Sequence, residues 1–464
     1  MSQLPMTAAA AAPIVNDRRE IFGWVMYDWA NSVFSTTVYT VLLGPYLIAL
    51  AESAVGKNGY VLPGVSAESL FPFSISLSVF LQVFFLPVLG AIADYTHLKK
   101  RLMQVFCYIG VAATCLMFFV TSGGYLFGAL LFIIANLCFG GSIVLYNSYL
   151  ADITTEDQRD RVSSQGFAWG YMGGGLLLLL NLLLFQFGPR LGIDRGMAVR
   201  LSLLSAGVWW GGFSLVTFSR LRQRAPTAPP PPGRSLLSVG FIELGNTFRE
   251  LARLPHTLKY LIGYLFYNDG IQTVIGLASV FLAAELFTAR GLEVDNSFLI
   301  ELILMVQFVA FFGALLFGKI AVRFGTKRAI LLSLLIWFGV VVYAYGFLNT
   351  MLDAWIMGAV LALALGGSQA LSRSLYSRMV PIKREAAFFG LYEISERGTS
   401  WMGPLIFGIV RDVTHSYRQA ILSVLVLLVV GAVVLALTNT TQAVIESGNV
   451  PAAEDMVGTA SVVV

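Results

Sequence analysis

The sequence predicts an all-α integral membrane protein with twelve transmembrane helices, arranged as two pseudo-symmetric six-helix bundles. Three observations predict this class. The chain of 464 residues is 57% hydrophobic but only 12% charged, whereas a soluble domain has about 25% charged residues. The apolar residues occur in runs long enough to cross a bilayer, and the two halves of the chain repeat. This composition excludes an ordinary soluble enzyme and a disordered chain.

Twelve apolar runs are expected to span the membrane, because each has close to the 20 residues or more that a hydrocarbon core about 30 Å thick requires. The first run is not interpreted as a signal peptide, since it carries Asp28 and Asn31 and lacks a short apolar core before a cleavage site. The runs cover residues 22–50, 72–93, 102–121, 125–150, 163–188, 198–219, 258–288, 297–322, 328–348, 352–379, 386–410 and 419–438.

The connections predict the orientation and the domain boundaries. Most of the 30 Lys and Arg residues fall in the connections on one side, which is typical of the cytoplasmic side. We therefore expect both termini in the cytoplasm. The expected parts are a flexible tail (1–20), an N-terminal bundle (21–219), a cytoplasmic linker (220–257), a C-terminal bundle (258–440) and a second tail (441–464).

The linker combines a Pro-rich segment with an amphipathic stretch. Pro229–Pro232 predicts a stiff, non-helical spacer. The apolar residues that follow recur at helical spacing and predict a helix lying on the inner membrane surface; a calmodulin-like docking site is the alternative. The stripe consists of Leu237, Phe241, Leu244, Phe248 and Leu251.

Short strings recur in the two halves at an offset close to half the chain length. Parallel repeats of six helices are typical of one large transporter architecture. The matching strings are Gly90–Ala93 with Gly318–Ala321, Gly140–Leu145 with Gly366–Leu371, and Gly166-Phe167 with Gly390-Leu391.

Polar side chains inside the spans predict a central chamber. A charged side chain in the bilayer core costs about 2.5–3.5 kcal/mol even on the insertion scale, so its position is informative. Spans three, six, nine and twelve carry no charge in their interiors, which suits four lipid-facing helices. Spans one, seven, ten and eleven carry charges at similar depth, with an amide about one turn away in the first three. The candidate chamber residues are Asp28, Asn31, Tyr146, Asn147, Asp269, Gln272, Gln369, Arg373, Glu393, Glu396 and Arg397.

Each chamber residue also has a structural interpretation. Glu393 and Arg397 could pair within one helix, and Asp28 and Asp269 could each bond a neighbouring amide. In the functional interpretation, a desolvated carboxylate loads and releases a proton or cation as access alternates. Arg373 would suit a substrate carboxylate, and an unpaired acid would suit an amine.

No motif indicates an enzyme, a cofactor or a metal site. The sequence has no P-loop, H-E-x-x-H or G-x-S-x-G string, and Cys107, Cys115 and Cys138 lack metal or disulfide spacing. Gly170–Gly175 lies within a span and predicts close helix contact. We expect a monomer that binds a small solute, membrane lipids and a coupling proton, and no nucleic acid.

The connection after span two has its own pattern. Small residues end the helix, and an acid precedes three bases, which would suit capping and lipid phosphate at the inner surface. These residues are Gly90, Asp94, Lys99, Lys100 and Arg101.

Gly90–Arg101 resembles the loop signature of the major facilitator superfamily, and Gly318–Arg328 resembles it more weakly, with Val322 in the place of the acid. Further strings resemble the vacuolar amino-acid effluxer-like branch, also called the unknown major facilitator family, over about residues 20–438. They are Tyr27–Ser32, Tyr146–Leu150, Tyr267–Gln272, Gly366–Ser374, Phe388–Glu393 and Gly398–Pro404.

This resemblance implies a secondary transporter that works by alternating access between two six-helix halves. Fungal members are linked to the release of amino acids from the vacuole into the cytosol, so the equivalent direction here is uptake into the cytoplasm. The compact loops resemble bacterial members, which implies a bacterial cytoplasmic membrane.

Two alternatives remain open. The first is a drug or metabolite efflux pump of the same superfamily, although the Gly-Pro pair typical of such pumps in span five is absent and Gly403-Pro404 lies in span eleven. The second is a membrane sensor or scaffold that keeps the fold but transports nothing.

Overall fold

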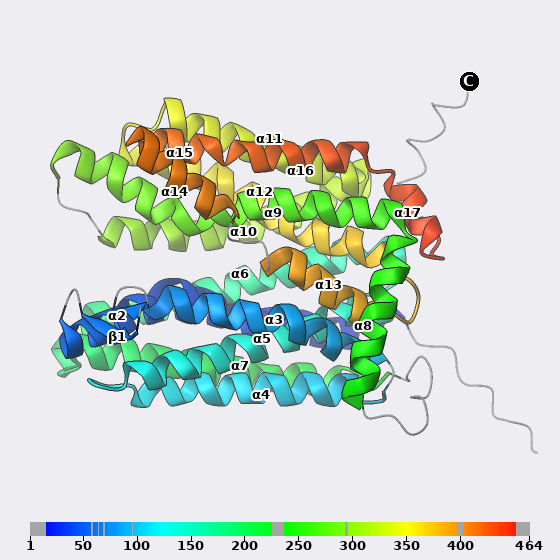
Figure 1. Cartoon of the computed structure of the whole chain (residues 1–464), viewed down its shortest axis with the longest axis horizontal. Coiled ribbons are helices and arrows are strands. Elements are labelled where there is room, and N and C mark those ends of the chain that lie inside the picture. Colours follow the sequence, from blue (N-terminus) through cyan, green and yellow to red (C-terminus); the bar gives the residue numbers. More distant parts are fainter. Residues whose placement is uncertain are drawn as a thin grey trace, which may run out of the picture.

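The computed structural model describes residues 15–56, 59–63, 65–67, 70–94, 96–224, 236–292, 296–397 and 402–451. Figure 1 shows two layers of long, roughly parallel helices: α1 to α7 form one layer and α9 to α16 form the other. Two short antiparallel strands, β1 (Tyr60–Leu62) and β2 (Val65–Ser66), form a hairpin between α2 and α3. The two layers correspond to the two halves in which the sequence repeats.

The N-terminal half begins with a continuous helical segment in which α1 passes through a π-helical stretch, η1 (Phe34–Leu42), into α2. The shorter 3-10 turns η2 (Met117–Phe119) and η3 (Gly188–Leu191) end α4 and α6. The helices of this half are α1 (Arg18–Val33), α2 (Leu43–Val55), α3 (Leu70–Asp94), α4 (Lys99–Leu116), α5 (Tyr125–Ile153), α6 (Glu156–Phe187) and α7 (Arg195–Arg220).

The C-terminal half has the corresponding helices. A π-helical stretch, η4 (Ala283–Phe287), and a 3-10 turn, η5 (Thr288–Arg290), extend the first of them. The helices are α9 (Pro255–Leu282), α10 (Asn296–Phe324), α11 (Thr326–Gly346), α12 (Met351–Arg378), α13 (Glu385–Arg397), α14 (Met402–Thr414), α15 (Tyr417–Ser423), α16 (Leu425–Leu437) and α17 (Thr440–Glu446).

Within the described residues, 11 helical segments are long and apolar enough to cross a membrane. Each coincides with one of the expected spans, and α15 with α16 together form the last. The remaining expected span, 386–410, corresponds to the two shorter helices α13 and α14. Residues 398–401 between them lie outside the described part of the chain. The helical membrane fold expected from the sequence is therefore confirmed.

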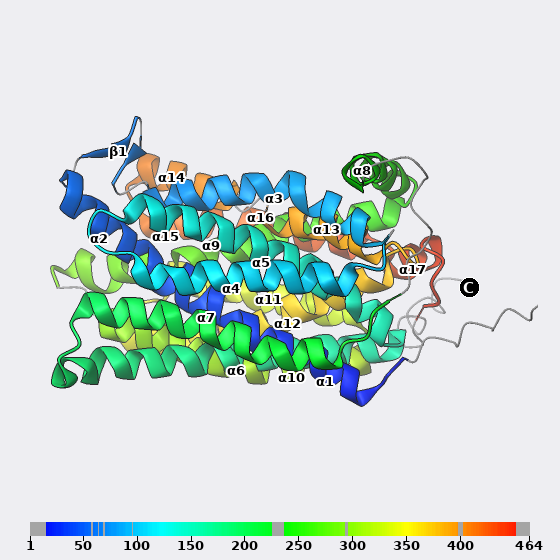
Figure 2. The same cartoon turned by 90° about the horizontal axis from the view of Figure 1, so that it is seen from below.

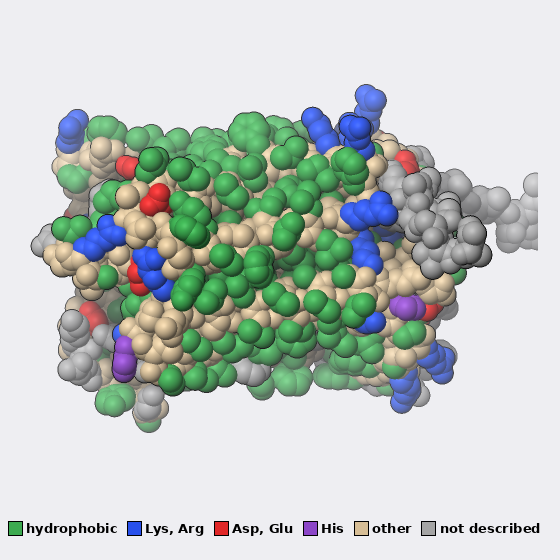
Figure 3. All heavy atoms as spheres, turned by 90° about the horizontal axis from the view of Figure 1, so that it is seen from above, with side chains coloured by type: hydrophobic (Ala, Val, Ile, Leu, Met, Phe, Trp, Pro, Cys, Tyr) green, Lys and Arg blue, Asp and Glu red, His purple; other side chains and the backbone are tan. Residues whose placement is uncertain are grey.

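The surface carries a wide apolar belt. Figure 3 shows hydrophobic side chains along the middle of the molecule, with Lys and Arg gathered toward its ends. Large apolar side chains of the spans, such as Phe312 and Leu335, are exposed. A lipid environment accounts for this exposure, because hydrocarbon is as apolar as these side chains.

The two halves touch at two symmetric places. α3 packs on α13, and α10 packs on α6. A Cβ atom on Gly90 would lie 2.1 Å from the carbonyl oxygen of Ala386, and one on Gly318 would lie 2.7 Å from Ser164 Oγ. Glycine at these positions lets the helices approach closely. The strings Gly90–Ala93 and Gly318–Ala321 thus occupy equivalent contacts in the structure.

A separate helix, α8 (Leu236–Ala252), lies across one end of the bundle, and α1 begins and α17 lies at this same end (Figures 1 and 2). We call this end of the bundle the basic end, because the helix termini there carry Lys99, Lys100, Arg323 and Lys327. The side of the bundle that faces away from α8 is the opposite end.

The apolar residues expected to form one stripe on α8 differ in their exposure. Leu251 is buried against the bundle, whereas Phe241 and Phe248 are 62% and 52% exposed. Arg384 fixes the helix from the protein side, since its Nη2 donates to Thr247 Oγ1 at 2.7 Å. Contact of α8 with a membrane surface stays a prediction.

Candidate transport cavity

A cavity of about 2100 Å³ lies between the two halves. Its lining runs from Asp28 of α1 and Arg373 of α12 to Pro45 of α2, Arg195 of α7 and Leu299 of α10. Helix α2 and the starts of α7 and α10 lie toward the end opposite α8 (Figures 1 and 2). The cavity therefore extends from the middle of the bundle to that opposite end.

Most of the chamber residues expected from the sequence line this cavity. These are Asp28, Asn31, Asn147, Gln272, Gln369, Arg373, Glu393 and Glu396. Tyr146 lies behind them and contacts Asp28. Asp269 is buried and faces another helix, and the side chain of Arg397 lies outside what the structure describes.

An ion pair between Asp28 and Arg373 crosses from one half to the other. Both terminal nitrogens of the guanidinium, Nη1 and Nη2, lie 3.2 Å from Asp28 Oδ2. The hydroxyl of Tyr146 donates to the same oxygen at 2.7 Å. Both charged side chains are at least nine-tenths buried, so each needs the other to offset the cost of its desolvation.

The Arg373 guanidinium is held by neutral groups as well. Its Nε donates to Ser163 Oγ at 2.9 Å, its Nη2 donates to the Ser163 carbonyl oxygen at 2.9 Å, and its Nη1 donates to Asn147 Oδ1 at 3.3 Å. Every nitrogen of the guanidinium thus has a partner on α5 or α6 besides Asp28.

Aromatic rings surround the same guanidinium. Its Cζ lies 4.2 Å from the ring centroid of Phe167 and 4.8 Å from that of Trp24, close enough for cation–π attraction. Trp24 stacks on Tyr146 with centroids 4.4 Å apart and donates its Nε1–H to the Tyr146 carbonyl. The rings fix the position of Arg373 and leave only its edge for hydrogen bonds.

Gly166 of α6 provides the space for the ion pair. A Cβ atom here would lie 2.4 Å from Asp28 Oδ2 and 2.9 Å from Arg373 Nη2. Any larger residue would push the two partners apart.

The acids of α13 and α9 have different neighbours. Glu393 is buried and accepts a hydrogen bond from Asn147 Nδ2 at 2.9 Å, so a second polar contact crosses the halves. Asp269 accepts from the backbone N–H of Gly403 at 3.1 Å, near the start of α14. Asp269 therefore makes the kind of bond that its structural interpretation requires, a bond to a neighbouring amide.

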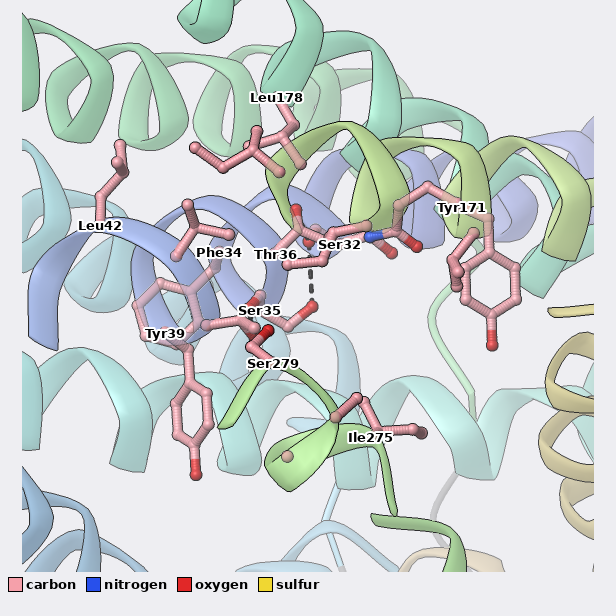
Figure 4. A pocket seen from close by; sticks show the side chains of 18 of the residues that line it. Ser32, Phe34, Ser35, Thr36, Tyr39, Leu42, Tyr171, Leu178, Ile275 and Ser279 are labelled. Atoms are coloured by element: carbon pink, nitrogen blue, oxygen red, sulfur yellow. Dashed lines mark hydrogen bonds between the residues drawn. The ribbon is translucent and has the colours of Figure 1, made fainter. Parts of the chain in front are cut away.

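Hydroxyl and amide groups lie among the apolar side chains that make up most of the cavity lining. Figure 4 shows Ser32, Ser35, Thr36 and Tyr39 of α1 and η1 with Ser279 of α9. Deeper in, the Tyr171 hydroxyl donates to Gln369 Oε1 at 2.5 Å. These groups suit a hydrated polar solute, because each can accept or donate a hydrogen bond.

Sequence reasoning missed Ser163, Gly166, Phe167 and Trp24, all of which contact the ion pair. They are uncharged, so their presence inside a span carries no energetic signal. Helical spacing offered a weak signal for Trp24, because this residue precedes Asp28 by about one helical turn.

The basic end is closed by contacts between the halves. Asp94, at the end of α3, accepts from the backbone N–H groups of Ala386 and Ala387 at 3.1 and 2.8 Å. It thereby caps the first turn of α13, where a carboxylate is favoured by the helix dipole. Of the other residues of the loop pattern, Lys99 pairs with Asp152 at 2.8 Å, and Lys100 donates to the Leu221 carbonyl at 2.6 Å.

A second set of contacts closes the same end on the other side of the pseudo-symmetry axis. Asp160 of α6 pairs with Arg378 of α12 at 2.8 Å and accepts from Thr326 Oγ1 at 2.6 Å. Val322 occupies the place of Asp94 in the second repeat and is 45% exposed. Asp160, on the helix α6 that packs against α10, thus supplies a polar contact at the place where Val322 cannot.

Two six-helix halves that enclose a polar cavity between them, closed at one end of the described bundle, define a transporter of the major facilitator class, not an enzyme. Solved structures of this class share the fold. A bacterial homologue of the iron transporter ferroportin in an outward-facing state aligns with a TM-score of 0.63 at 13% identity, covering 90% of this chain and 98% of that one. The Escherichia coli fucose:proton symporter FucP aligns with a TM-score of 0.62 at 12% identity, covering 90% and 97%.

The chain belongs to the vacuole effluxer Atg22-like family, whose model matches residues 16–448. It is 31% identical to the uncharacterized MFS-type transporter YxiO of Bacillus subtilis, over 89% of this chain and 93% of that relative. It is 26% identical to autophagy-related protein 22-1 of Aspergillus niger, over 89% and 87%. The resemblance found in the sequence is thus confirmed, and the protein is a multi-pass membrane transporter.

Proposed function

We propose that this protein is a proton-coupled secondary transporter that carries an amino acid into the cytoplasm by alternating access. The observation that carries the proposal is the Asp28–Arg373 pair, which joins the two halves at the inner part of the cavity. A charge pair at this place has to respond when the halves move, so it can couple solute binding to the change of access.

An amino acid suits the lining. The cavity offers the carboxylates of Glu393 and Glu396 and the guanidinium of Arg373, among amides and hydroxyls. A zwitterion brings one charge of each sign, so its binding leaves no net charge in a partly desolvated site. The family name, which describes a vacuole effluxer, supports the same class of solute through the resemblance of the sequence to amino-acid effluxers.

The proposed inward direction rests on the resemblance to fungal effluxers, because the vacuole lumen is topologically outside and release from it into the cytosol corresponds to uptake here. The basic end carries most of the Lys and Arg residues and is proposed to be cytoplasmic. The cavity extends away from that end, which makes this the outward-facing state of a monomer in a bacterial cytoplasmic membrane.

Uptake into proteoliposomes tests the proposal. We expect a mixture of radiolabelled L-amino acids to accumulate when the outside is acidic, and D28N and E396Q to lower the initial rate at least tenfold. R290Q, an exposed change in η5, is the control and should transport as wild type does. Unaltered rates in both cavity variants would show that the chamber residues are assigned wrongly.

A further inference from the structure

We propose that Arg373 is the carboxylate-binding group of the cavity and that Asp28 is its built-in competitor, so that a substrate carboxylate binds Arg373 only after Asp28 has taken up a proton. This inference rests on the proposed function and adds to it the chemical basis of coupling. The substrate class is a solute with a free carboxylate.

Few cations could bind such a carboxylate. Among the described residues that line the cavity, the only basic side chains are Arg373 and Arg195. Arg195 is exposed at the first residue of α7, far along the cavity from Asp28. Arg373 is 3% exposed and lies between the halves. A carboxylate that reaches the inner cavity therefore has Arg373 as its cationic partner.

The present contact of Arg373 with Asp28 is weaker than an ideal pair. Both guanidinium nitrogens bond the same oxygen, Oδ2, at 3.2 Å. A fork-to-fork pair would use both carboxylate oxygens at about 2.7–2.9 Å. Asp28 Oδ1 receives no hydrogen bond from the described residues. An incoming carboxylate with both oxygens available can therefore make a better pair than Asp28 does.

The guanidinium stays in place when Asp28 is neutral. Ser163 accepts from its Nε and Nη2, and Asn147 accepts from its Nη1. Phe167 and Trp24 cover its faces. The site is thus preorganised without Asp28, and the entropy of fixing a long side chain is not lost again when the ligand binds.

The charge balance sets the ratio of protons to solute. In the state described here, Asp28 and Arg373 carry opposite charges and neutralise each other. When one proton converts the Asp28 carboxylate to the neutral acid, one ligand carboxylate restores neutrality at Arg373, while the ammonium group of an amino acid has the acids Glu393 and Glu396 of the lining as partners. No bond other than the O–H bond of Asp28 is formed, and one proton accompanies each carboxylate.

The other titratable groups near Asp28 come from four elements. α5 contributes Tyr146, α6 contributes Tyr171, α12 contributes Arg373, and α13 contributes Glu393 and Glu396. Tyr146 donates to Asp28 Oδ2, and the acids of α13 add negative charge. α7, also packed on α1, brings Trp209 and Phe213 against Trp29 and no charge in that contact. Arg373 is thus the cation that faces Asp28.

Chemical labelling of Arg373 tests the inference without a known substrate. Purified full-length protein is treated with p-hydroxyphenylglyoxal, which modifies accessible guanidinium groups, and the peptide containing Arg373 is quantified by mass spectrometry. D28N mimics the neutral acid and should raise labelling of Arg373 at least fivefold. D269N removes a buried carboxylate that bonds Gly403 instead and should label as wild type does. Gel-filtration profiles confirm that each variant is folded.

Protection experiments identify the ligand. In D28N, acetate or a mixture of neutral L-amino acids should lower labelling of Arg373 at least threefold, whereas the corresponding carboxamides should not. Equal labelling of wild type and D28N, or equal protection by the carboxamides, would overturn the inference.

Uptake and labelling measured together distinguish a failure of this inference from a failure of the proposed function. Amino-acid uptake in proteoliposomes together with equal labelling of wild type and D28N would refute the competition but leave the transported class intact. Protection by acetate together with no amino-acid uptake would support the carboxylate site and refute the amino acid as substrate.

Discussion

At the scale of single residues, several buried charges have partners that explain their positions. Asp28 and Arg373 pair across the halves, Asp94 caps α13, and Asp160 pairs with Arg378. A buried charge without a partner would cost several kcal/mol. The contacts between the halves are therefore polar at their centre and apolar around it.

Gly166 leaves the space that the Asp28–Arg373 ion pair occupies. G166A should separate Asp28 from Arg373, since its Cβ would lie 2.4 Å from Asp28 Oδ2. We expect a loss of stability of about 1–3 kcal/mol from overpacking and at least a tenfold loss of uptake, measured by thermal unfolding and in proteoliposomes.

G212A is the matched control, because a Cβ on this glycine of α7 would meet nothing within 4 Å. It should leave uptake unchanged and raise stability by up to about 1 kcal/mol, as Ala is the better helix former. Wild-type uptake by G166A would show that the ion pair does not need the space that this glycine leaves.

Glu385 lies at the basic end, outside the spans, and is expected to make the stability of the protein depend on pH. Burial raises the pKa of this carboxyl, and the negative charge of Asp152 raises it further, while Lys99 opposes the shift. Because the folded pKa lies above the unfolded one, the protonated acid favours the folded state. Its contribution is complete below the unfolded pKa, about 4.3, and is lost as the pH rises through the folded pKa.

E385Q removes this titration but can keep the hydrogen bond from the Lys383 backbone N–H. The melting temperature of wild type should therefore fall relative to that of E385Q as the pH rises from about 4 to 8. A difference that is constant or of opposite sign over this range would contradict the assignment.

At the scale of helices, the closure of the basic end depends on contacts made by a few terminal helical turns. Asp94 accepts from two N–H groups in the first turn of α13. D94A should leave these groups unsatisfied and cost about 0.5–2 kcal/mol. Hydrogen exchange at Ala386 and Ala387 should accelerate, which mass spectrometry of peptides from α13 can measure.

Asp194 provides the control for this change, because it caps α7 through the Met197 N–H near the opposite end. D194A should cost a similar amount of stability but should not alter exchange in α13. If both variants changed exchange in α13 equally, the effect would be global destabilisation instead of local loss of the cap.

The helices could be predicted from the sequence to within a few residues because lipid requires long apolar runs. The start of α6 was predicted less well, at residue 163 instead of Glu156, because its first two turns are polar. Span eleven corresponds to α13 and α14, and residues 398–401 between them lie outside the described part of the chain.

The candidate site was predicted as a set of residues but not as a set of contacts. Asp28 and Arg373 are 345 residues apart, and a pattern of charges does not say which acid meets which base. The neutral groups Ser163 and Gly166 could not be found, because no penalty marks them in a membrane helix.

At the scale of the whole molecule, the structure is an asymmetric state of a pseudo-symmetric transporter. Gly90 and Gly318 bring the halves together at the basic end, while the cavity extends to the opposite end. Alternating access requires these contacts to separate and the other end to close. Proton and solute must therefore bias the same equilibrium between two arrangements of the halves.

Distances between spin labels across each end test this claim most directly. A variant with the three native cysteines replaced by alanine would carry labels at Ser53 and Arg290 for the end opposite α8, or at Arg101 and Arg323 for the basic end. These four positions are exposed. We predict that acidic pH together with L-amino acids shortens the first distance and lengthens the second. Substrate uptake with neither distance changing would contradict alternating access between the two halves.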